Sequence, residues 1–152
     1  MIADQTLHAS CVLMGEAGIL IRGPAGSGKS LLARDLILDA KPLGRFARLV
    51  GDDRVRVCNR NGRLLATAIP AIAGKLEARG FGVLTMPYEN SAIVRIVIDC
   101  LSERPPRLPA PSDRTVSLCG VSLPRIGTRI EPGVSRIILW RLDHPGDVLV
   151  TD

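Results

Sequence analysis

The sequence predicts a single mixed α/β domain in which strands outnumber helices. Its 152 residues suit one domain. Hydrophobic residues make up 46% and charged residues 23% of the chain, which is ordinary for a globular protein with a packed core. One glycine-rich loop stands between an apolar strand pattern and a helical pattern, and short strand patterns follow it, as α/β folds require.

The first half of the chain begins with a predicted hairpin, residues 6–14 and 18–22, joined by Gly15-Glu16-Ala17. After the glycine-rich loop, apolar residues recur at helical spacing over 29–40, and Pro42 and Gly44 end that helix. Strand patterns follow, and Asn61-Gly62 marks a tight hairpin between two of them. The expected strands are 45–50, 54–58 and 64–69.

The second half is less regular at first, because residues 71–88 are rich in glycine. Residues 91–101 predict a buried strand, and the proline-rich segment 102–113 predicts an extended loop. Residues 115–123 predict a short strand pair, and Pro132 can open a final helix over 133–142. We therefore expect residues 1–152 to form one domain with a proline-rich loop.

Charge and cysteine content exclude several classes of protein. The apolar runs are broken by charges, and the N-terminus carries no basic region, so neither a membrane helix nor a secretory signal is predicted. The four cysteines form no CxxC pair, which favours reduced thiols in a cytoplasmic protein. The net charge is +5, but the arginines are scattered and only four aromatic residues exist, so nucleic-acid binding is not expected.

The most specific motif is a phosphate-binding loop of the form G-x-x-x-x-G-K-[ST]. Its glycines let backbone N–H groups point at phosphate oxygens, and the helix that follows adds its positive N-terminal dipole. In this pattern the lysine reaches the β- and γ-phosphates and the serine hydroxyl binds Mg²⁺. The motif therefore predicts a bound nucleotide and Mg²⁺. Its residues are Gly23, Pro24, Ala25, Gly26, Ser27, Gly28, Lys29 and Ser30.

Two acidic positions could complete this site. Asp99 ends a β-branched run, as the aspartate of many P-loop enzymes does. The pair Asp52-Asp53 also follows an apolar run, and in an extended chain its two carboxylates would face opposite sides. One could then accept a proton while the other bound metal. Spacing alone leaves the two positions open.

Three blocks of sequence resemble the bacterial HPr kinase/phosphorylase family. His8 stands on a predicted strand that leads into the phosphate-binding loop, and the segment 48–57, RLVGDDRVRV, resembles the paired-aspartate block of the family. The segment 76–83, LEARGFGV, resembles its signature, in which Glu-x-Arg-Gly precedes an apolar residue and glycine. The likeness is good over residues 5–85 and weaker over 115–143.

The resemblance implies an activity and a fold. Members of the family use Mg²⁺ and ATP to phosphorylate a serine of the phosphocarrier protein HPr, and they remove it with inorganic phosphate, which yields pyrophosphate. Their P-loop kinase domain is similar to that of phosphoenolpyruvate carboxykinase, and it forms hexamers. The chain looks like the short, catalytic-domain-only form found in α-proteobacteria. We therefore expect a cytoplasmic homo-oligomeric enzyme with an HPr-type partner.

Site roles carried over from the resemblance favour Asp52 over Asp99. They make Asp52 the general base in phosphorylation and the acid in the reverse reaction, with His8 tuning its proton affinity. Arg79 would position the phosphate chemistry. The expected Mg²⁺ ligands are Ser30, Glu77 and, as an additional ligand, Asp53.

Departures from the family pattern keep two alternatives open. Leu31 stands where the family usually has glutamate, and the stretch between Lys29 and Asp52 is longer than usual. One alternative is a P-loop kinase for a small molecule, with 102–113 as its lid. The other is a regulatory module that binds a nucleotide without turnover.

Overall fold

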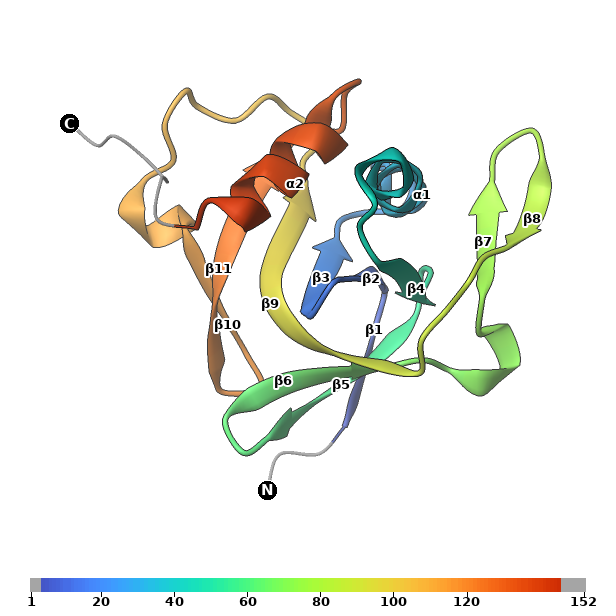
Figure 1. Ribbon diagram of the computed structural model, residues 1–152. Helices are drawn as coiled ribbons and strands as arrows, with labels where there is room; N and C mark the ends of the chain where they lie inside the picture. Colours follow the sequence, from blue (N-terminus) through green and yellow to red (C-terminus); the bar gives the residue numbers. More distant parts are fainter. Residues whose placement is uncertain (1–3, 146–152) are drawn as a thin grey trace.

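The computed structural model describes residues 4–145. Within them, nine strands form one strongly curled sheet and two further strands form a separate hairpin (Figure 1). The sheet contains β1 (Gln5–Leu7), β2 (Ala9–Met14), β3 (Ala17–Arg22), β4 (Ala47–Gly51), β5 (Val55–Arg60), β6 (Arg63–Thr67), β9 (Ser91–Cys100), β10 (Thr115–Leu118) and β11 (Val121–Thr128). The hairpin contains β7 (Lys75–Ala78) and β8 (Gly82–Thr85). The helices are α1 (Lys29–Ala40), α2 (Val134–Asp143) and the short 3₁₀ turns η1 (Lys41–Leu43), η2 (Pro70–Ile72) and η3 (Pro111–Asp113).

Strand β9 lies at the centre of the sheet, and it pairs with different strands along its length. Its first residues pair antiparallel with β6, for example Ile93 with Leu65. Its later residues pair parallel with β3 on one side and with β11 on the other, so that Ile98 lies between Ile21 and Ile126. The carboxyl ends of these three parallel strands therefore meet at one edge of the sheet, and the glycine-rich loop leaves β3 at that edge.

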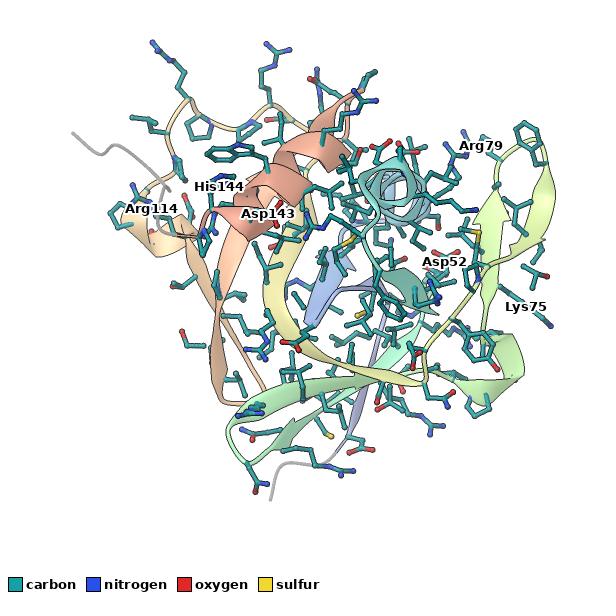
Figure 2. All side chains as sticks on the ribbon, in the orientation of Figure 1. Asp52, Lys75, Arg79, Arg114, Asp143 and His144 are labelled. Carbon is teal, nitrogen blue, oxygen red and sulfur yellow. The ribbon has the colours of Figure 1, made fainter. Side chains whose placement is uncertain are left out.

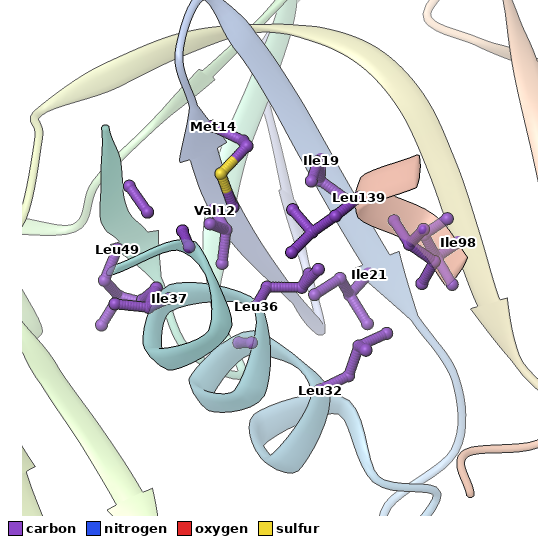
Figure 3. Packing of buried hydrophobic residues seen from close by; sticks show 14 of the residues in the cluster. Val12, Met14, Ile19, Ile21, Leu32, Leu36, Ile37, Leu49, Ile98 and Leu139 are labelled. Atoms are coloured by element: carbon purple, nitrogen blue, oxygen red, sulfur yellow. The ribbon is translucent and has the colours of Figure 1, made fainter. Parts of the chain in front are cut away.

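Two hydrophobic cores lie on the two faces of the sheet. Helices α1 and α2 cover one face, where Leu32 and Leu36 of α1 and Leu139 of α2 pack against inward-facing residues of β2, β3 and β9 (Figure 3). The curled strands enclose the second core on the other face, around Leu20 and Val97. Strand alternation explains both cores, since neighbouring residues of β3 and β9 point to opposite faces. No helix within residues 4–145 has the length and apolar character needed to cross a membrane.

Most elements confirm the sequence predictions. The helix 29–40, the hairpin 9–14/17–22, the strand at 91–100 and the strand pair at 115–118/121–128 all form. The turn Asn61-Gly62 has φ values of 55° and 82°, the left-handed conformation that this dipeptide favours in hairpins. The final helix begins at Val134, and the proline-rich segment contains only the turn η3.

Three expectations were wrong. His8 does not lie on a strand, because the chain bends there between β1 and β2. Asp52 and Asp53 lie in the turn between β4 and β5, where Asp53 has a φ of 64°, so they are not opposite faces of an extended chain. Residues 71–88 contain the β7–β8 hairpin, whose glycine-rich sequence obscured its strand alternation.

An ion-pair cluster fastens the three parallel strands just before the glycine-rich loop. Arg22 at the end of β3 donates two hydrogen bonds of 2.8 Å to the carboxylate of Asp99 in β9. Arg125 of β11 donates a third, of 2.6 Å, to the same carboxylate. Burial by itself would raise the pKa of Asp99, but the hydrogen bonds from Arg22 and Arg125 outweigh it and lower that pKa. The cluster therefore stabilises the fold only while Asp99 is ionised.

We expect Asp99→Asn to lower the free energy of unfolding by about 2 kcal/mol at neutral pH, because charged hydrogen bonds of this kind contribute roughly that much. The folded-state pKa lies below the ordinary value of 3.8. The wild-type advantage is therefore fully present above the ordinary value and is lost as the pH falls through the folded-state pKa. Denaturant unfolding of both proteins from pH 7 to pH 3 measures this. Asp35→Asn, which removes an exposed partner of Arg34, is the control and should change little. An Asp99→Asn deficit equally large at pH 7 and at the acid end would contradict the assignment.

Candidate functional site

The glycine-rich loop is held against the end of β9 by close backbone contacts. A Cβ atom on Gly23 would lie 2.6 Å from Ser27 Oγ and 2.9 Å from the carbonyl oxygen of Cys100, so only glycine fits there. Gly28 has a φ of 101°, and a Cβ on it would lie 3.0 Å from the side chain of Ile130. Within the loop, the Ser27 N–H donates to the carbonyl of Pro24 at 3.1 Å. Gly23 and Gly28 are therefore required by packing as well as by backbone conformation, whereas Gly26, with a φ of 78°, is required by backbone conformation alone.

The loop opens into the N-terminus of α1, which is built to receive an anion. The cap residue Gly28 offers no side-chain hydrogen bond, and the first turn of the helix contains no acidic residue. The first N–H groups and the positive end of the helix dipole therefore remain available to phosphate. Lys29 is 7% exposed, and its ammonium donates to the carbonyls of Gly23 at 2.7 Å and Pro24 at 3.3 Å. These two hydrogen bonds hold the Lys29 ammonium beside the first residues of the loop.

Asp52 is the carboxylate that faces this loop. It is 9% exposed, and its Oδ1 accepts the hydroxyl of Ser30 at 2.6 Å and that of Ser10 at 2.8 Å. Among residues 4–145, its Oδ2 accepts only the backbone N–H of Glu77, at 3.2 Å. A carboxylate offers about four acceptor positions, so Oδ2 retains one for a further donor. Asp52 consequently joins the first turn of α1, strand β2 and strand β7.

Asp53 lies beside Asp52 but in a different environment. Its side chain is 65% exposed, and its Oδ1 lies 4.0 Å from the ammonium of Lys29. Its backbone N–H donates to Ser10 Oγ at 3.2 Å. The turn therefore directs one carboxylate inward, against Ser30, and presents the other to solvent near the lysine.

The β7–β8 hairpin borders the site on the side away from α2 (Figure 1). Leu76 and Ala78 of β7 are buried against the core on the α1 side, and this contact fixes the hairpin beside the helix. Figure 2 shows Asp52 between α1 and β7, and Arg79 at the end of β7 beside the helix. The side chains of Glu77 and Arg79 are exposed. They border the site without forming any hydrogen bond of their own among the described side chains.

Two candidate residues are not joined to this cluster. His8 is exposed in its bend, and no side-chain hydrogen bond within residues 4–145 links it to Asp52. Asp99, the last residue but one of β9, points to the opposite face of the sheet, since its neighbours Ile98 and Cys100 belong to the core that contacts α1. It is bound by Arg22 and Arg125 instead. The geometry thus selects Asp52 over Asp99 as the partner of the P-loop serine.

Ser10 is a member of the site that sequence reasoning missed. It is fully buried in β2 and binds Asp52 with its hydroxyl. A polar residue at the start of the apolar run in β2 was the available signal, but a serine there is equally compatible with an ordinary strand. Glu77 was expected for its carboxylate, whereas its backbone N–H makes the recorded contact with Asp52.

The residues present fit Mg²⁺ bound together with a nucleotide. No cluster of three or more His, Cys, Asp or Glu side chains suited to a metal occurs in the described part of the chain. Mg²⁺ in phosphoryl-transfer sites needs no such cluster, because phosphate oxygens and water supply most of its ligands. The Ser30 hydroxyl gives its hydrogen to Asp52, which leaves its lone pairs available to a cation. The exposed carboxylate of Asp53 lies close by.

A separate cavity of about 420 Å³ lies between the end of α1 and α2, and no P-loop residue lines it. Its lining includes Leu43, Arg45 and Trp140. It is therefore not an acceptor pocket adjoining the phosphate loop, which a small-molecule kinase would need there.

Comparison with known proteins connects this site with a family. The sequence model of one protein family, the HPr serine kinase C-terminal domain, matches residues 1–95 of this chain. HPr kinase/phosphorylase of Clostridium tetani is 38% identical over 98 residues, which is 62% of this chain and 30% of that protein. HPr kinase/phosphorylase of Prosthecochloris aestuarii is 30% identical over 141 residues, 85% of this chain and 39% of that protein. The chain thus spans only about a third of the length of these curated relatives.

A solved structure extends the likeness beyond residue 95. The Hpr(Ser) kinase/phosphatase of Coxiella burnetii superimposes with a TM-score of 0.73 at 28% identity and covers 93% of both chains. The mixed α/β fold with its curled sheet is thereby shared along nearly the whole chain. By sequence and by fold, this chain belongs to the HPr serine kinase C-terminal domain family.

Proposed function

We propose that this chain is a serine protein kinase and phosphorylase. It transfers phosphate from Mg²⁺-ATP to a serine of an HPr-type phosphocarrier protein, and it removes that phosphate with inorganic phosphate to yield pyrophosphate. The observation that carries the proposal is the hydrogen bond from the P-loop Ser30 to Asp52, which in turn accepts the backbone N–H of Glu77 in the β7–β8 hairpin. It joins the three sequence blocks that resemble the family.

The P-loop, residues 23–30, binds the nucleotide phosphates. Backbone N–H groups and the uncapped start of α1 surround the phosphates, and Lys29 carries the compensating charge. When phosphate enters, the ammonium exchanges the carbonyls of Gly23 and Pro24 for phosphate oxygens. Phosphoryl transfer needs this charge compensation more than it needs a strong base, because its transition state is loose and largely dissociative.

Ser30 binds Mg²⁺, with Asp53 and Glu77 contributing carboxylates directly or through water. When bound, Mg²⁺ neutralises charge on the β- and γ-phosphates. Asp52 keeps the hydroxyl hydrogen of Ser30 directed away from the cation. Asp53 also balances the charge of Lys29, from which its Oδ1 lies 4.0 Å.

Asp52 accepts the proton of the substrate serine through Oδ2. Its Oδ1 already receives two hydroxyl donors, whereas Oδ2 receives one long backbone hydrogen bond. The same carboxyl returns the proton in phosphorolysis, as microscopic reversibility requires. Arg79, beside α1 in Figure 2, orients the transferred phosphate. His8, in the bend that precedes β2, is the third residue of the proposed catalytic set.

The proposal also covers partner and assembly. Residues 1–152 act as one cytoplasmic catalytic domain, with 102–113 as a loop and with homo-oligomers, hexamers by family likeness, as the working form. The acceptor serine approaches between the P-loop and the β7–β8 hairpin, where Asp52 lies.

A phosphotransfer assay tests the activity directly. Protein, Mg²⁺, γ-labelled ATP and HPr from the same source should give label on an HPr serine, because the site holds the groups that the transfer needs. Added inorganic phosphate should then release labelled pyrophosphate. HPr with its acceptor serine changed to alanine is the control. Nucleotide binding with no transfer to HPr would contradict the proposal and favour a nucleotide-binding module, whereas transfer to a small molecule would favour the other kinase class.

Replacement of Asp52 separates chemistry from binding. Asp52→Asn should lower kcat by about 10³-fold, within the range that general-base catalysis contributes. ATP affinity without Mg²⁺ should change little, because the P-loop and Lys29 are untouched. Single-turnover transfer and calorimetric ATP binding without Mg²⁺ measure the two effects. Asp99→Asn, on the other face of the sheet, should keep kcat within a few fold. The assignment fails if Asp99→Asn abolishes transfer in a folded protein while Asp52→Asn does not.

A further inference from the structure

Ser10 has no counterpart among the expected site residues, yet it is fully buried beside the acidic pair. Its hydroxyl donates to Asp52 Oδ1 at 2.8 Å and accepts the backbone N–H of Asp53 at 3.2 Å. A buried hydroxyl is costly unless its hydrogen-bonding capacity is used, and here both its donor and an acceptor position are used. Ser10 is therefore specifically connected to both carboxylate residues.

The first of these bonds orients Asp52. Both Ser10 and Ser30 donate to the same oxygen, Oδ1, at 2.8 and 2.6 Å. Two donors on one oxygen, with the Glu77 N–H on the other, define the rotation of the carboxylate. Without Ser10, the carboxylate can turn, and the Ser30 hydroxyl loses its fixed acceptor. The lone pairs of Ser30 would then no longer be held toward a cation.

The second bond fixes the backbone of Asp53. This residue has a φ of 64°, a left-handed conformation that is uncommon for residues other than glycine. Acceptance of its N–H by Ser10 Oγ supports that conformation. This backbone conformation places the Asp53 carboxylate 4.0 Å from the Lys29 ammonium. One buried hydroxyl thus sets the direction of both acidic side chains relative to the P-loop.

We propose that Ser10 is a positioning residue for the metal–nucleotide complex, holding Asp52 against Ser30 and Asp53 beside Lys29. This inference rests on the proposed Mg²⁺-nucleotide function of the site. Ser10 itself touches neither metal nor nucleotide. Its effect is on the part of nucleotide affinity that depends on Mg²⁺, because one bond ends at Asp52, which orients the metal ligand Ser30, and the other ends at Asp53, which is a metal ligand itself.

Nucleotide binding with and without Mg²⁺ tests this role. ADP titrations by calorimetry give the factor by which Mg²⁺ tightens binding. Ser10→Ala should reduce that factor by about 10-fold or more, the range seen when a group that orients a metal ligand is removed. ADP affinity without Mg²⁺ should stay within about 2-fold. Ser10→Thr keeps the hydroxyl and should recover most of the Mg²⁺ effect.

Ser135→Ala is the matched control. Ser135 is also a buried serine, 5% exposed, whose hydroxyl donates to an aspartate, Asp39, but it lies at the α1–α2 contact. Its replacement should lower thermal stability while leaving the Mg²⁺ effect unchanged. Where Ser10→Ala does not fold, Ser10→Cys preserves the volume with a much weaker donor and gives the same comparison.

Several results would overturn the inference. If Ser10→Ala keeps the full Mg²⁺ effect, or loses affinity equally with and without Mg²⁺, Ser10 has only a structural role. If the wild-type protein binds no ADP at all, the proposed function fails together with this inference. Wild-type binding that Mg²⁺ enhances, combined with an unaffected Ser10→Ala, overturns the role of Ser10 alone.

Discussion

The carboxylate of Asp52 is the point at which separate segments of the chain meet. Ser30 from α1, Ser10 from β2 and the Glu77 N–H from β7 all donate to it. These donors are far apart in sequence, so the group can form only when the sheet, the helix and the hairpin have all packed. A buried carboxylate without those donors would be strongly disfavoured. The polar centre therefore requires the complete fold around it, and its geometry is fixed by that fold.

The two faces of the sheet separate chemistry from support. On the α1 face, the carboxyl end of β3 leads to the P-loop and the carboxyl end of β4 leads to Asp52. On the opposite face, Asp99 binds Arg22 and Arg125 and fastens the ends of β3, β9 and β11. Arg22 directly precedes Gly23, but its side chain and the rest of this ion-pair cluster lie on the face of the sheet away from α1. Two aspartates that look alike in sequence thus serve different purposes because they lie on opposite faces of the sheet, Asp52 against Ser30 of α1 and Asp99 against Arg22 and Arg125.

Features encoded in adjacent residues could be predicted from the sequence, and features created by tertiary packing could not. The P-loop, the helix 29–40 and the turn Asn61-Gly62 are local, and all three form as expected. The choice between Asp52 and Asp99 stayed open on pattern alone, since both follow apolar strands. The choice depends on which face of the sheet each aspartate occupies, and that is known only from the folded structure. Ser10 escaped notice because its partners lie more than 40 residues away in sequence.

The change of partners along β9 also has a consequence for folding kinetics. β3 and β9 pair parallel although about 75 residues separate them, as the contact between Ile21 and Ile98 illustrates. Such long-range pairing forms slowly, because a long loop must close before any contact repays the lost chain entropy. The hairpin β2–β3 and helix α1 are local and can form earlier. Gly23 packs on Cys100 of β9, so the phosphate loop gains its backing only when β9 docks. Nucleotide binding should therefore be among the last properties that the folding chain acquires, even though the motif itself lies near its beginning.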